Sequence, residues 1–345
     1  MIFVEDDINS NYLTTLFKSK GIIDKENCVV SMTKELQNSE GSLSFASDIT
    51  YSENKNTLPK SIFIKLDKIR GSKHYKNLTR NEIDFYRLSQ KYKIDFIPKM
   101  IDAGYDNQFS YLILEDLSET HFVCEYESSI DFYKIAAKKI AESHNKFKQL
   151  KLCDFTIGKH SPISHKAIDL DLILYNYIQI LSLLGENLTK ENKDILDSAW
   201  HKLKNNLGLI NNHLSSKQDT IVHGDFHLKN CLFNKKIPNE NMIILDWQWW
   251  NWGIGTYDMA HLLNLYLPKG YKDREIEVLK VYYDKLKELE YQYSWNECFE
   301  DYKLFTTLNL FKPAFYAINC RLRRTSKFWA AFIENIIISY NGLNI

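Results

Sequence analysis

The pattern of apolar and polar positions divides the chain into two dissimilar parts. Up to about residue 120, short runs with strand character alternate with turn-like stretches, and amphipathic segments at 8–19 and 74–92 predict two helices. Strands are predicted over 28–36, 42–52, 60–68 and 111–117. Beyond about residue 125 the periodicity is mostly helical, and helices are predicted over 131–147, 169–184, 192–207, 273–289 and 294–311. We therefore expect a small strand-rich part followed by a large helical part.

The composition is that of a globular protein without net charge. Of 345 residues, 44% are hydrophobic and 26% are charged, and 44 Lys and Arg balance 44 Asp and Glu. This balance argues against a general binder of nucleic acid or of anionic membranes, because both partners are held by basic surface. No run approaches about eighteen apolar residues, so no membrane span is expected.

The cysteines and the N-terminus indicate the compartment. The six cysteines are widely spaced and form no CxxC pair, so neither a zinc knuckle nor a disulfide framework is predicted. The first residues, MIFVEDDINSNYL, lack the basic and apolar segments of a secretory signal. We expect reduced thiols and a cytoplasmic protein.

The segment TIVHGDFHLKNCLFN, residues 220–234, concentrates the candidate chemistry. His223, Asp225 and His227 alternate, so a strand would place them on one face, where they could hold a metal ion as in a metallohydrolase. That interpretation needs further ligands elsewhere, and the remaining histidines form no second cluster. Otherwise His223 is expected to brace the loop, and His227 either packs structurally or contacts phosphate.

A phosphoryl-transfer loop is the alternative interpretation of the same segment. Asn230 follows Asp225 by five positions, the spacing of Asp and Asn in the kinase catalytic loop H-R-D-x-x-x-x-N. The carboxylate would take the proton of an acceptor hydroxyl, and the amide oxygen would bind Mg²⁺ on the phosphates. A second carboxylate should follow on a nearby strand, and IILDWQ supplies Asp246 there.

The remaining parts of a nucleotide site occur in the chain order that a kinase fold requires. Lys65 lies in the strand SIFIKL, where alternation places it on the face of Phe63, and Glu82 in the next helix can orient it. The strand YLILEDL then fits a hinge, in which the backbone from Glu115 to Leu117 binds adenine.

These motifs together resemble the aminoglycoside phosphotransferase and choline kinase group of small-molecule kinases. HGDFHLKN resembles that group's H-G-D-x-H-x-x-N loop, LDWQ stands where protein kinases have D-F-G, and GTYDMAHLL resembles its Gly-x-x-Asp-x-Ala element. INSNYLTTLF, EIDFYRL, LILEDL and the late VYYDKLKEL are most similar to the ecdysteroid-kinase-like branch. Asp258, in the Gly-x-x-Asp-x-Ala element, is either a helix N-cap or, as the resemblance implies, an anchor for the catalytic loop.

The resemblance implies an α+β, protein-kinase-like, two-lobed fold. Residues 1–117 would form a small lobe built on an antiparallel sheet, and residues 118–345 a large, mostly helical lobe. It further implies a kinase that uses ATP or GTP and Mg²⁺ to phosphorylate a hydroxyl of a small molecule. Antibiotic-, choline- and steroid-like alcohols all remain open as substrates.

Two sets of binding residues are less specific. The phosphate-covering loop lacks G-x-G-x-x-G, so hydroxyls of Ser42, Ser44 or Ser47 are candidates for phosphate contacts. After the metal aspartate, a run of tryptophans offers either an aromatic wall for the substrate or lobe packing, the candidates for the wall being Trp249, Trp250 and Trp252. The segment 311–324 is a further candidate wall.

Two other classes of protein stay open from the sequence. A nucleotide-binding pseudokinase or scaffold would keep the same motifs without transferring phosphate. A metallohydrolase would use His223, Asp225 and His227 instead.

Overall fold

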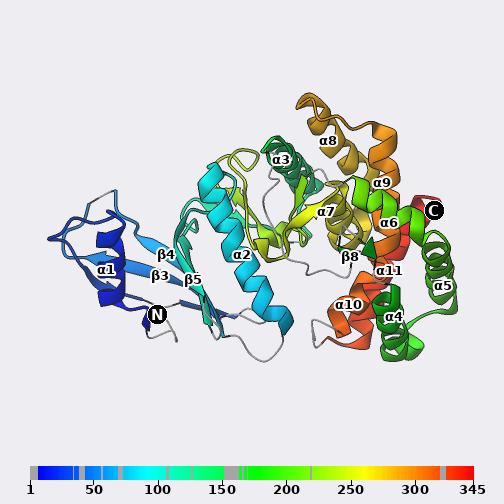
Figure 1. The fold of residues 1–345 in the computed structure, drawn as a ribbon, viewed down its shortest axis with the longest axis horizontal. Coiled ribbons are helices and arrows are strands. Elements are labelled where there is room, and N and C mark those ends of the chain that lie inside the picture. Colours follow the sequence, from blue (N-terminus) through cyan, green and yellow to red (C-terminus); the bar gives the residue numbers. More distant parts are fainter. Residues whose placement is uncertain are drawn as a thin grey trace. The chain divides into compact units, whose positions relative to one another are not determined.

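A computed structural model of the chain describes residues 7–33, 35–38, 43–55, 57–68, 73–105, 109–125, 127–150, 163–164, 167–168, 170–217, 220–318 and 324–345. It divides into two compact units (Figure 1). Unit 1 comprises Met1–Phe122 and Ile243–Gln248, and unit 2 comprises Val123–Met242 and Trp249–Ile345. The six residues around Asp246 therefore return to unit 1, which a single boundary after residue 117 does not anticipate.

Unit 1 is built on one antiparallel sheet of order β1-β3-β4-β6-β5, with β2 paired to β3. Its strands are β1 (Val29–Met32), β2 (Glu35–Asn38), β3 (Leu43–Tyr51), β4 (Ser61–Lys68), β5 (Met100–Tyr105) and β6 (Phe109–Glu115). The predicted strand 28–36 is present as β1 and β2, which both pair with β3. The sequence did not predict β5. Two short strands, β7 (His121–Val123), which crosses the unit boundary, and β12 (Ile243–Ile244), are not part of this sheet.

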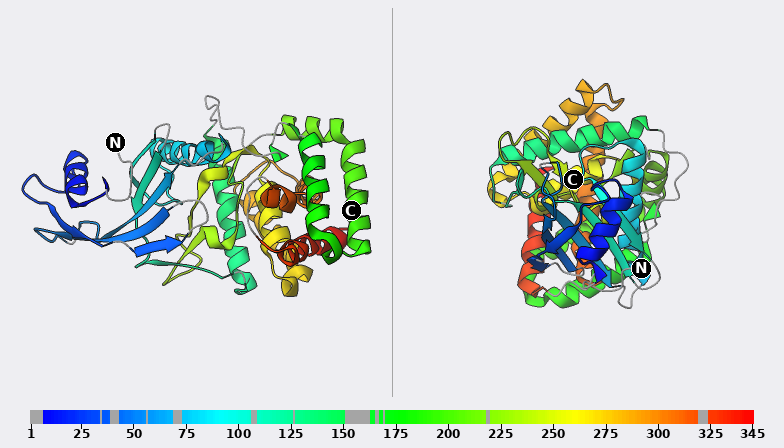
Figure 2. Two further views of the ribbon diagram at one scale, coloured as in Figure 1. Left: turned by 90° about the horizontal axis from the view of Figure 1, so that it is seen from below. Right: turned by 90° about the vertical axis from the view of Figure 1, so that its left-hand side faces the viewer.

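The two helices of unit 1 are α1 (Ser10–Ser19) and α2 (Lys73–Tyr92), and α2 lies beside β5 (Figure 2). Asn9 begins α1 because its side chain accepts hydrogen bonds from the backbone N–H groups of Asn11 and Tyr12. Leu16 and Phe17 share the buried face of α1. They join one apolar cluster with Phe45, Ile62, Ile64 and Ile113 on one face of the sheet.

Unit 2 is mostly helical. Its helices are α3 (Ile130–Gln149), α4 (Leu170–Leu184), η2 (Gly185–Asn187), α5 (Lys190–Asn205), α6 (Leu207–Ser216), η3 (Leu228–Asn230), α7 (Thr256–Ala260), the π-helix η5 (His261–Tyr266), η6 (Lys269–Arg274), α8 (Glu275–Glu288), α9 (Trp295–Asn309), α10 (Lys312–Ile318) and α11 (Ser326–Gly342). The 3₁₀ turn η4 (Trp247–Trp249) spans the boundary between the units. In Figure 1, α8 packs along α3, and α10 packs along α4.

The strands of unit 2 are few and short. They are β8 (Ile163–Ser164), β9 (Ala167–Ile168), β10 (Thr220–Val222), β11 (Cys231–Asn234) and β13 (Asn251–Gly253). The antiparallel pair of β10 and β13 places Val222 opposite Asn251, so the segment 220–234 begins on a fixed strand. An antiparallel-sheet unit followed by a mainly helical one is the α+β architecture that the sequence predicts.

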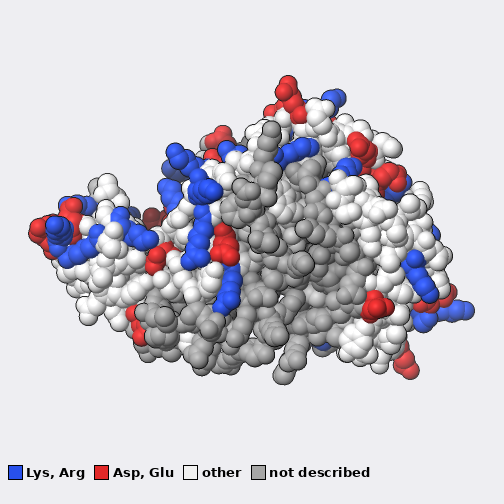
Figure 3. All heavy atoms as spheres, viewed as in Figure 1, with Lys and Arg blue, Asp and Glu red and all other residues white. Residues whose placement is uncertain are grey.

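The surface agrees with the balanced composition. On the described part of the face in Figure 3, basic and acidic side chains lie interspersed on both units. In the ranges that the structure covers, no helix is long and apolar enough to cross a membrane.

The packing of α1 gives a direct test of the unit 1 core. Phe17 is fully buried, so Phe17→Ala should destabilise the protein by about 3–5 kcal/mol through lost burial and a residual cavity. Urea unfolding followed by tryptophan fluorescence and circular dichroism measures the change. Lys18→Ala, on the exposed side of the same helix, should change stability by less than about 0.5 kcal/mol. Equal effects of the two substitutions would contradict the placement of α1.

Candidate active site

Lys65 lies on the face of the sheet opposite the apolar cluster. Ile62 and Ile64 are fully buried in that cluster, and strand alternation turns Lys65 the other way. Its Nζ lies 2.7 Å from Glu82 Oε2 on α2 and 2.7 Å from Asp246 Oδ1. The structure therefore brings three of the predicted site residues together within unit 1.

The two carboxylates keep Lys65 charged in a sheltered place. Burial alone would lower the pKa of Lys65, but the negative charges of Asp246 and Glu82 hold it above its ordinary value. Glu82 is only 3% exposed, so removing the ammonium would leave a buried carboxylate without its cation.

Asp246 occupies a strained backbone position. Its φ of 60° lies in the left-handed region, which is rare for a residue other than glycine. Nearby packing fixes it: the ring of Trp247 stacks on Phe85 of α2 with centroids 4.0 Å apart. Asn81 also donates a hydrogen bond to the backbone carbonyl of Gln248. The segment around Asp246 is thus anchored to the helix that carries Glu82.

Two of the serines that were predicted to contact phosphate lie on opposite faces of the sheet. Ser44 pairs with Lys65 across β3 and β4, so both side chains share one face of the sheet. Ser47 lies on the opposite face, is fully buried, and donates its hydroxyl to the Thr33 carbonyl. The structure thus separates Ser47 from Lys65, and Ser42 lies outside the described residues.

The two hinge candidates lie at the end of β6. The backbone N–H of Glu115 donates to the Lys99 carbonyl, and the carbonyl of Leu117 accepts from the His121 N–H at 2.8 Å. The N–H of Leu117 and the carbonyl of Glu115 are therefore the groups to consider for a nucleobase.

In unit 2, a buried carboxylate shapes the loop that follows β10. Asp258 Oδ2 accepts the backbone N–H of His223 at 2.7 Å, and Oδ1 accepts that of Gly224 at 2.9 Å. His144 Nε2 lies 3.0 Å from the same carboxylate. Burial would raise the pKa of Asp258, but these hydrogen bonds, led by that of His144, hold it below its ordinary value. The anchor role that the resemblance implies for Asp258 is confirmed, since the N-cap of α7 is Gly255.

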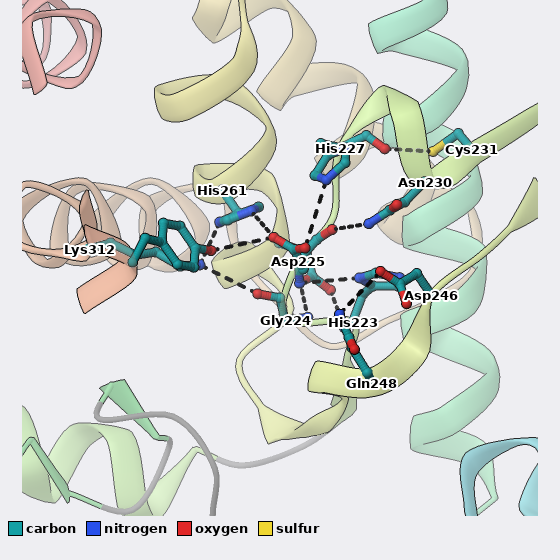
Figure 4. A network of polar contacts seen from close by, with 12 residues as sticks. His223, Gly224, Asp225, His227, Asn230, Cys231, Asp246, Gln248, His261 and Lys312 are labelled. Atoms are coloured by element: carbon teal, nitrogen blue, oxygen red, sulfur yellow. Dashed lines mark hydrogen bonds and ion pairs between the residues drawn. The ribbon is translucent and has the colours of Figure 1, made fainter. Parts of the chain in front are cut away.

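Asp225 is the functional group that this loop presents (Figure 4). Its Oδ1 lies 2.9 Å from His261 Nε2 and accepts the hydroxyl of Tyr316 at 3.4 Å. Its Oδ2 lies 3.8 Å from His227 Nε2. Burial would raise the pKa of Asp225, but the hydrogen bond from His261, followed by the charges of His227 and Lys312, keeps it well below its usual range. Asp225 is therefore an ionised hydrogen-bond acceptor.

His261 and Lys312 are site residues that the sequence reasoning did not single out. Lys312 Nζ lies 2.5 Å from His261 Nδ1, and both side chains are buried. His261 begins the π-helix η5, three positions after the anchor Asp258, and this offset was the one available sequence signal. Lys312 comes from α10, 87 positions after Asp225; it lies in the candidate wall 311–324, but no spacing rule connects it to Asp225.

Side chains from the next helix, η6, and from the distant helix α11 hold the π-helix. Lys272 Nζ donates to the carbonyls of Leu263 and Asn264, and Asn335 Nδ2 donates to those of Asn264 and Leu265. A π-helix leaves such carbonyls without regular α-helical partners. These bonds stabilise the backbone that carries His261.

Asn230 closes the loop from its other end. Its Nδ2 donates to the backbone carbonyl of Asp225 at 2.9 Å. With the amide nitrogen engaged in this way, the amide oxygen is the atom that remains to meet a cation.

The metal-cluster interpretation of the loop has no support in the side-chain arrangement. His223 is fully buried and accepts the backbone N–H of Asp225 at its Nδ1, so it braces the loop as predicted. In the part of the chain that the structure describes, no group of three or more His, Cys, Asp or Glu side chains is arranged to hold a metal ion. His223, Asp225 and His227 therefore do not form the site that a metallohydrolase needs.

The tryptophans after Asp246 divide between core and surface. Trp250 is 3% exposed, so it presents almost no surface to a substrate, which corrects its selection as a wall. Trp249 and Trp252 are half-buried and remain candidates. Trp249 packs edge-to-face on Phe315 of α10, part of the other candidate wall, of which residues 319–323 are not described.

Comparison of the sequence with known protein families identifies a match. The sequence profile of the ecdysteroid kinase-like family matches residues 48–293, more than two thirds of the chain. Among curated proteins, no significant sequence match is found.

Three solved structures illustrate the similarity. An ADP-bound aminoglycoside phosphotransferase, APH(2'')-Ib, has a TM-score of 0.53 at 15% identity over 96% of this chain and 99% of that one. Ethanolamine kinase of Plasmodium vivax has 0.51 at 12% identity, over 97% and 87%. A microcompartment-associated aminopropanol kinase has 0.58 at 11% identity, over 91% of each chain. The fold is thus the protein-kinase-like α+β fold of small-molecule kinases.

Gly224 provides a test of the loop geometry. Its φ is 86°, and an added Cβ would collide with the backbone carbonyl of Trp249. Gly224→Ala should therefore destabilise the protein by more than about 2 kcal/mol in urea unfolding. Gly185→Ala is the matched control in the same unit, because its φ is 50° with nothing within 4 Å of the new Cβ. A cost for Gly224→Ala no larger than for Gly185→Ala would show that the loop is not packed as described.

The buried histidine predicts a specific pH dependence of stability. Burial, then the charge of Lys312, lowers the pKa of His261 to about 3. In the unfolded chain it should titrate near about 6.5, so the unfolded state binds the extra proton between these values. The contribution of neutral His261 to the free energy of unfolding is thus fully present above about pH 6.5. It is lost as the pH falls toward about 3, by about 1 kcal/mol per pH unit.

The comparison of wild type with His261→Gln isolates this contribution. Glutamine does not titrate. The free energy of unfolding of His261→Gln should therefore fall less steeply than that of wild type as the pH is lowered from about 6 to about 4. Urea unfolding at several pH values measures both slopes. Parallel curves would mean that His261 titrates alike in the folded and unfolded chains.

Proposed function

The chain belongs to the ecdysteroid kinase-like family, and from this premise we propose that it transfers the γ-phosphoryl group of ATP to a hydroxyl of a small molecule with Mg²⁺. The family makes it a small-molecule kinase with an alcohol acceptor. The use of ATP, the use of Mg²⁺ and the roles of the individual residues are proposed below.

The observation that carries the proposal is the state of Asp225. It is ionised, one of its oxygens is held by His261, and its side chain retains 19% exposure. Such a carboxylate can accept the hydrogen bond of an acceptor hydroxyl. The acceptor oxygen then forms the new bond to the γ-phosphorus as the bond to the β–γ bridging oxygen breaks. The hydroxyl proton passes to Asp225, and ADP leaves.

Nucleotide binding is assigned to unit 1. A charged Lys65, oriented by Glu82, suits the α- and β-phosphates, and Ser44 on the same sheet face is the favoured hydroxyl. Glu115 and Leu117 would meet the adenine through their backbone. The ADP in the similar phosphotransferase structure supports a nucleotide as the donor.

The donor atoms proposed for the metal suit magnesium. Asn230 offers an amide oxygen and Asp246 a carboxylate, and oxygen donors are those that Mg²⁺ prefers. When bound, the metal would neutralise charge on the phosphates. Neither of these two proposed ligands is a thiolate, the soft ligand that would favour zinc instead.

The acceptor is proposed to be an apolar or cationic alcohol. Aromatic rings gather near Asp225: Tyr266 packs on His227 with centroids 4.6 Å apart, and Phe332 packs on Tyr266. Aromatic faces bind apolar surface and positive charge. Choline-like and steroid-like alcohols therefore rank ahead of sugars as first acceptors to test.

The test is a screen of ATP consumption over a library of hydroxyl compounds, with Asp225→Asn as the blank. Asp225→Asn should reduce turnover by about 10²–10⁴-fold, because the hydroxyl loses its proton acceptor. The affinity for Mg·ATP, measured by calorimetry, should stay within about twofold of wild type, because the substitution does not touch the nucleotide residues.

Asp284→Asn is the control for the substitution itself, since Asp284 is exposed in the same unit. It should turn over like wild type. Wild-type turnover in Asp225→Asn would refute the assignment of the base. A thermal shift with Mg·ATP but no phosphorylated compound would indicate a nucleotide-binding scaffold.

A further inference from the structure

We propose that Lys312 and His261 act as positioning residues, forming a buried relay that fixes Asp225 and selects Oδ2 as the oxygen that meets the acceptor. The inference rests on the proposed function, because it gives Asp225 the role of base.

The hydrogen-bond directions in the relay follow from the chemistry of the groups. An ammonium can only donate, so Lys312 Nζ must donate to His261 Nδ1, 2.5 Å away. Nδ1 must then carry the lone pair, and the ring proton must sit on Nε2. Nε2–H donates to Asp225 Oδ1 at 2.9 Å (Figure 4). His261 is therefore a neutral bridge between a cation and a carboxylate.

Burial explains why the relay holds together. Lys312 is 4% exposed and His261 is fully buried. An ammonium in such a place requires acceptors and negative charge nearby. Its Nζ also donates to the Tyr257 hydroxyl at 2.9 Å and to the Gly224 carbonyl at 3.4 Å. Lys312 thus contacts the loop backbone directly and the carboxylate of Asp225 through the ring.

The relay makes the two oxygens of Asp225 unequal. Oδ1 accepts from His261 and from Tyr316. Oδ2 has His227 Nε2 at 3.8 Å, beyond hydrogen-bond distance, and no closer donor among the described residues. An acceptor hydroxyl therefore meets Oδ2, while Oδ1 stays bound and stops the carboxylate from rotating. A carboxylate held in this way needs no reorientation at the moment of transfer.

The same unit holds a second lysine, histidine and aspartate in a different arrangement. Lys217 Nζ lies 2.9 Å from Asp301 Oδ2, and His213 Nε2 lies 2.5 Å from Asp301 Oδ1. There the lysine contacts the carboxylate directly and the histidine bridges nothing. Lys217 is the matched control, because Lys217→Met removes a lysine from a buried aspartate outside the site.

The first experiment reads the relay itself and needs no turnover. Nitrogen NMR of the ¹⁵N-histidine-labelled protein, with His261 assigned by its absence in His261→Gln, should find the neutral Nε2–H tautomer at neutral pH. In Lys312→Met the Nε2–H tautomer of His261 should no longer predominate, or it should exchange with the Nδ1–H tautomer. A Nδ1–H tautomer or an imidazolium in the wild type would overturn the relay.

The second experiment measures what the relay does, with Mg·ATP alone and water in the acceptor position. Lys312→Met and His261→Leu should each lower kcat for ATP hydrolysis about 10–100-fold, with KM for Mg·ATP within about twofold of wild type. His261→Gln keeps an N–H near the place of Nε2 and should recover part of the rate. Lys217→Met should stay within about threefold of wild type.

The outcomes separate the two proposals. Unchanged kcat in Lys312→Met and His261→Leu, or a change confined to KM, would overturn the positioning role. Loss of folding in Lys312→Met, seen by circular dichroism, moves the test to Lys312→Arg. Its larger head should still lower kcat, and wild-type kcat there would count against the relay. A wild type without any ATP turnover would refute the proposed function, while the tautomer measurement would still decide the relay.

Discussion

The site depends above all on one buried carboxylate, that of Asp258. It accepts the N–H groups of two successive loop residues, His223 and Gly224, and is itself held by His144. Two adjacent amides can point at one carboxylate only if the backbone turns sharply, which is why Gly224 adopts a φ of 86°. Asp225 follows directly after this turn. His261, three positions after Asp258, then holds the carboxylate of Asp225. The short segment from Asp258 to His261 thus both shapes the loop and orients its functional group.

In each unit, a buried lysine interacts with the carboxylates of the site. In unit 1 the ammonium of Lys65 lies directly against Glu82 and Asp246. In unit 2 the ammonium of Lys312 reaches Asp225 through an imidazole. The bridged arrangement helps to keep the Asp225 carboxylate ionised, although burial alone would raise its pKa. Direct contact gives a charged lysine with a fixed direction, suited to phosphate. The bridged contact leaves one oxygen of the aspartate for another partner, as a proton acceptor requires.

The sequence predicted the parts of the site that depend on local spacing, and missed those that depend on tertiary contact. Lys65 lies on the predicted strand face because side chains alternate. The same rule separates Ser44 from Ser47, since an odd spacing within one strand reverses the face. His261 lies in the GTYDMAHLL element and Lys312 in the segment 311–324, but neither motif nor spacing shows that the two side chains meet at Asp225, which follows only from the packing of α10 and the π-helix. The burial of Trp250 likewise follows from packing, which a run of aromatic residues does not reveal.

The central claim is that the γ-phosphoryl group moves to an alcohol. Phosphorus NMR of Mg·ATP with the protein and the best acceptor tests it most directly, because the signals of ATP, ADP, inorganic phosphate and a phosphate monoester are distinct. The account predicts one monoester formed for each ADP, with little inorganic phosphate. ADP and inorganic phosphate in equal amounts with every acceptor, or no loss of ATP at all, would contradict it.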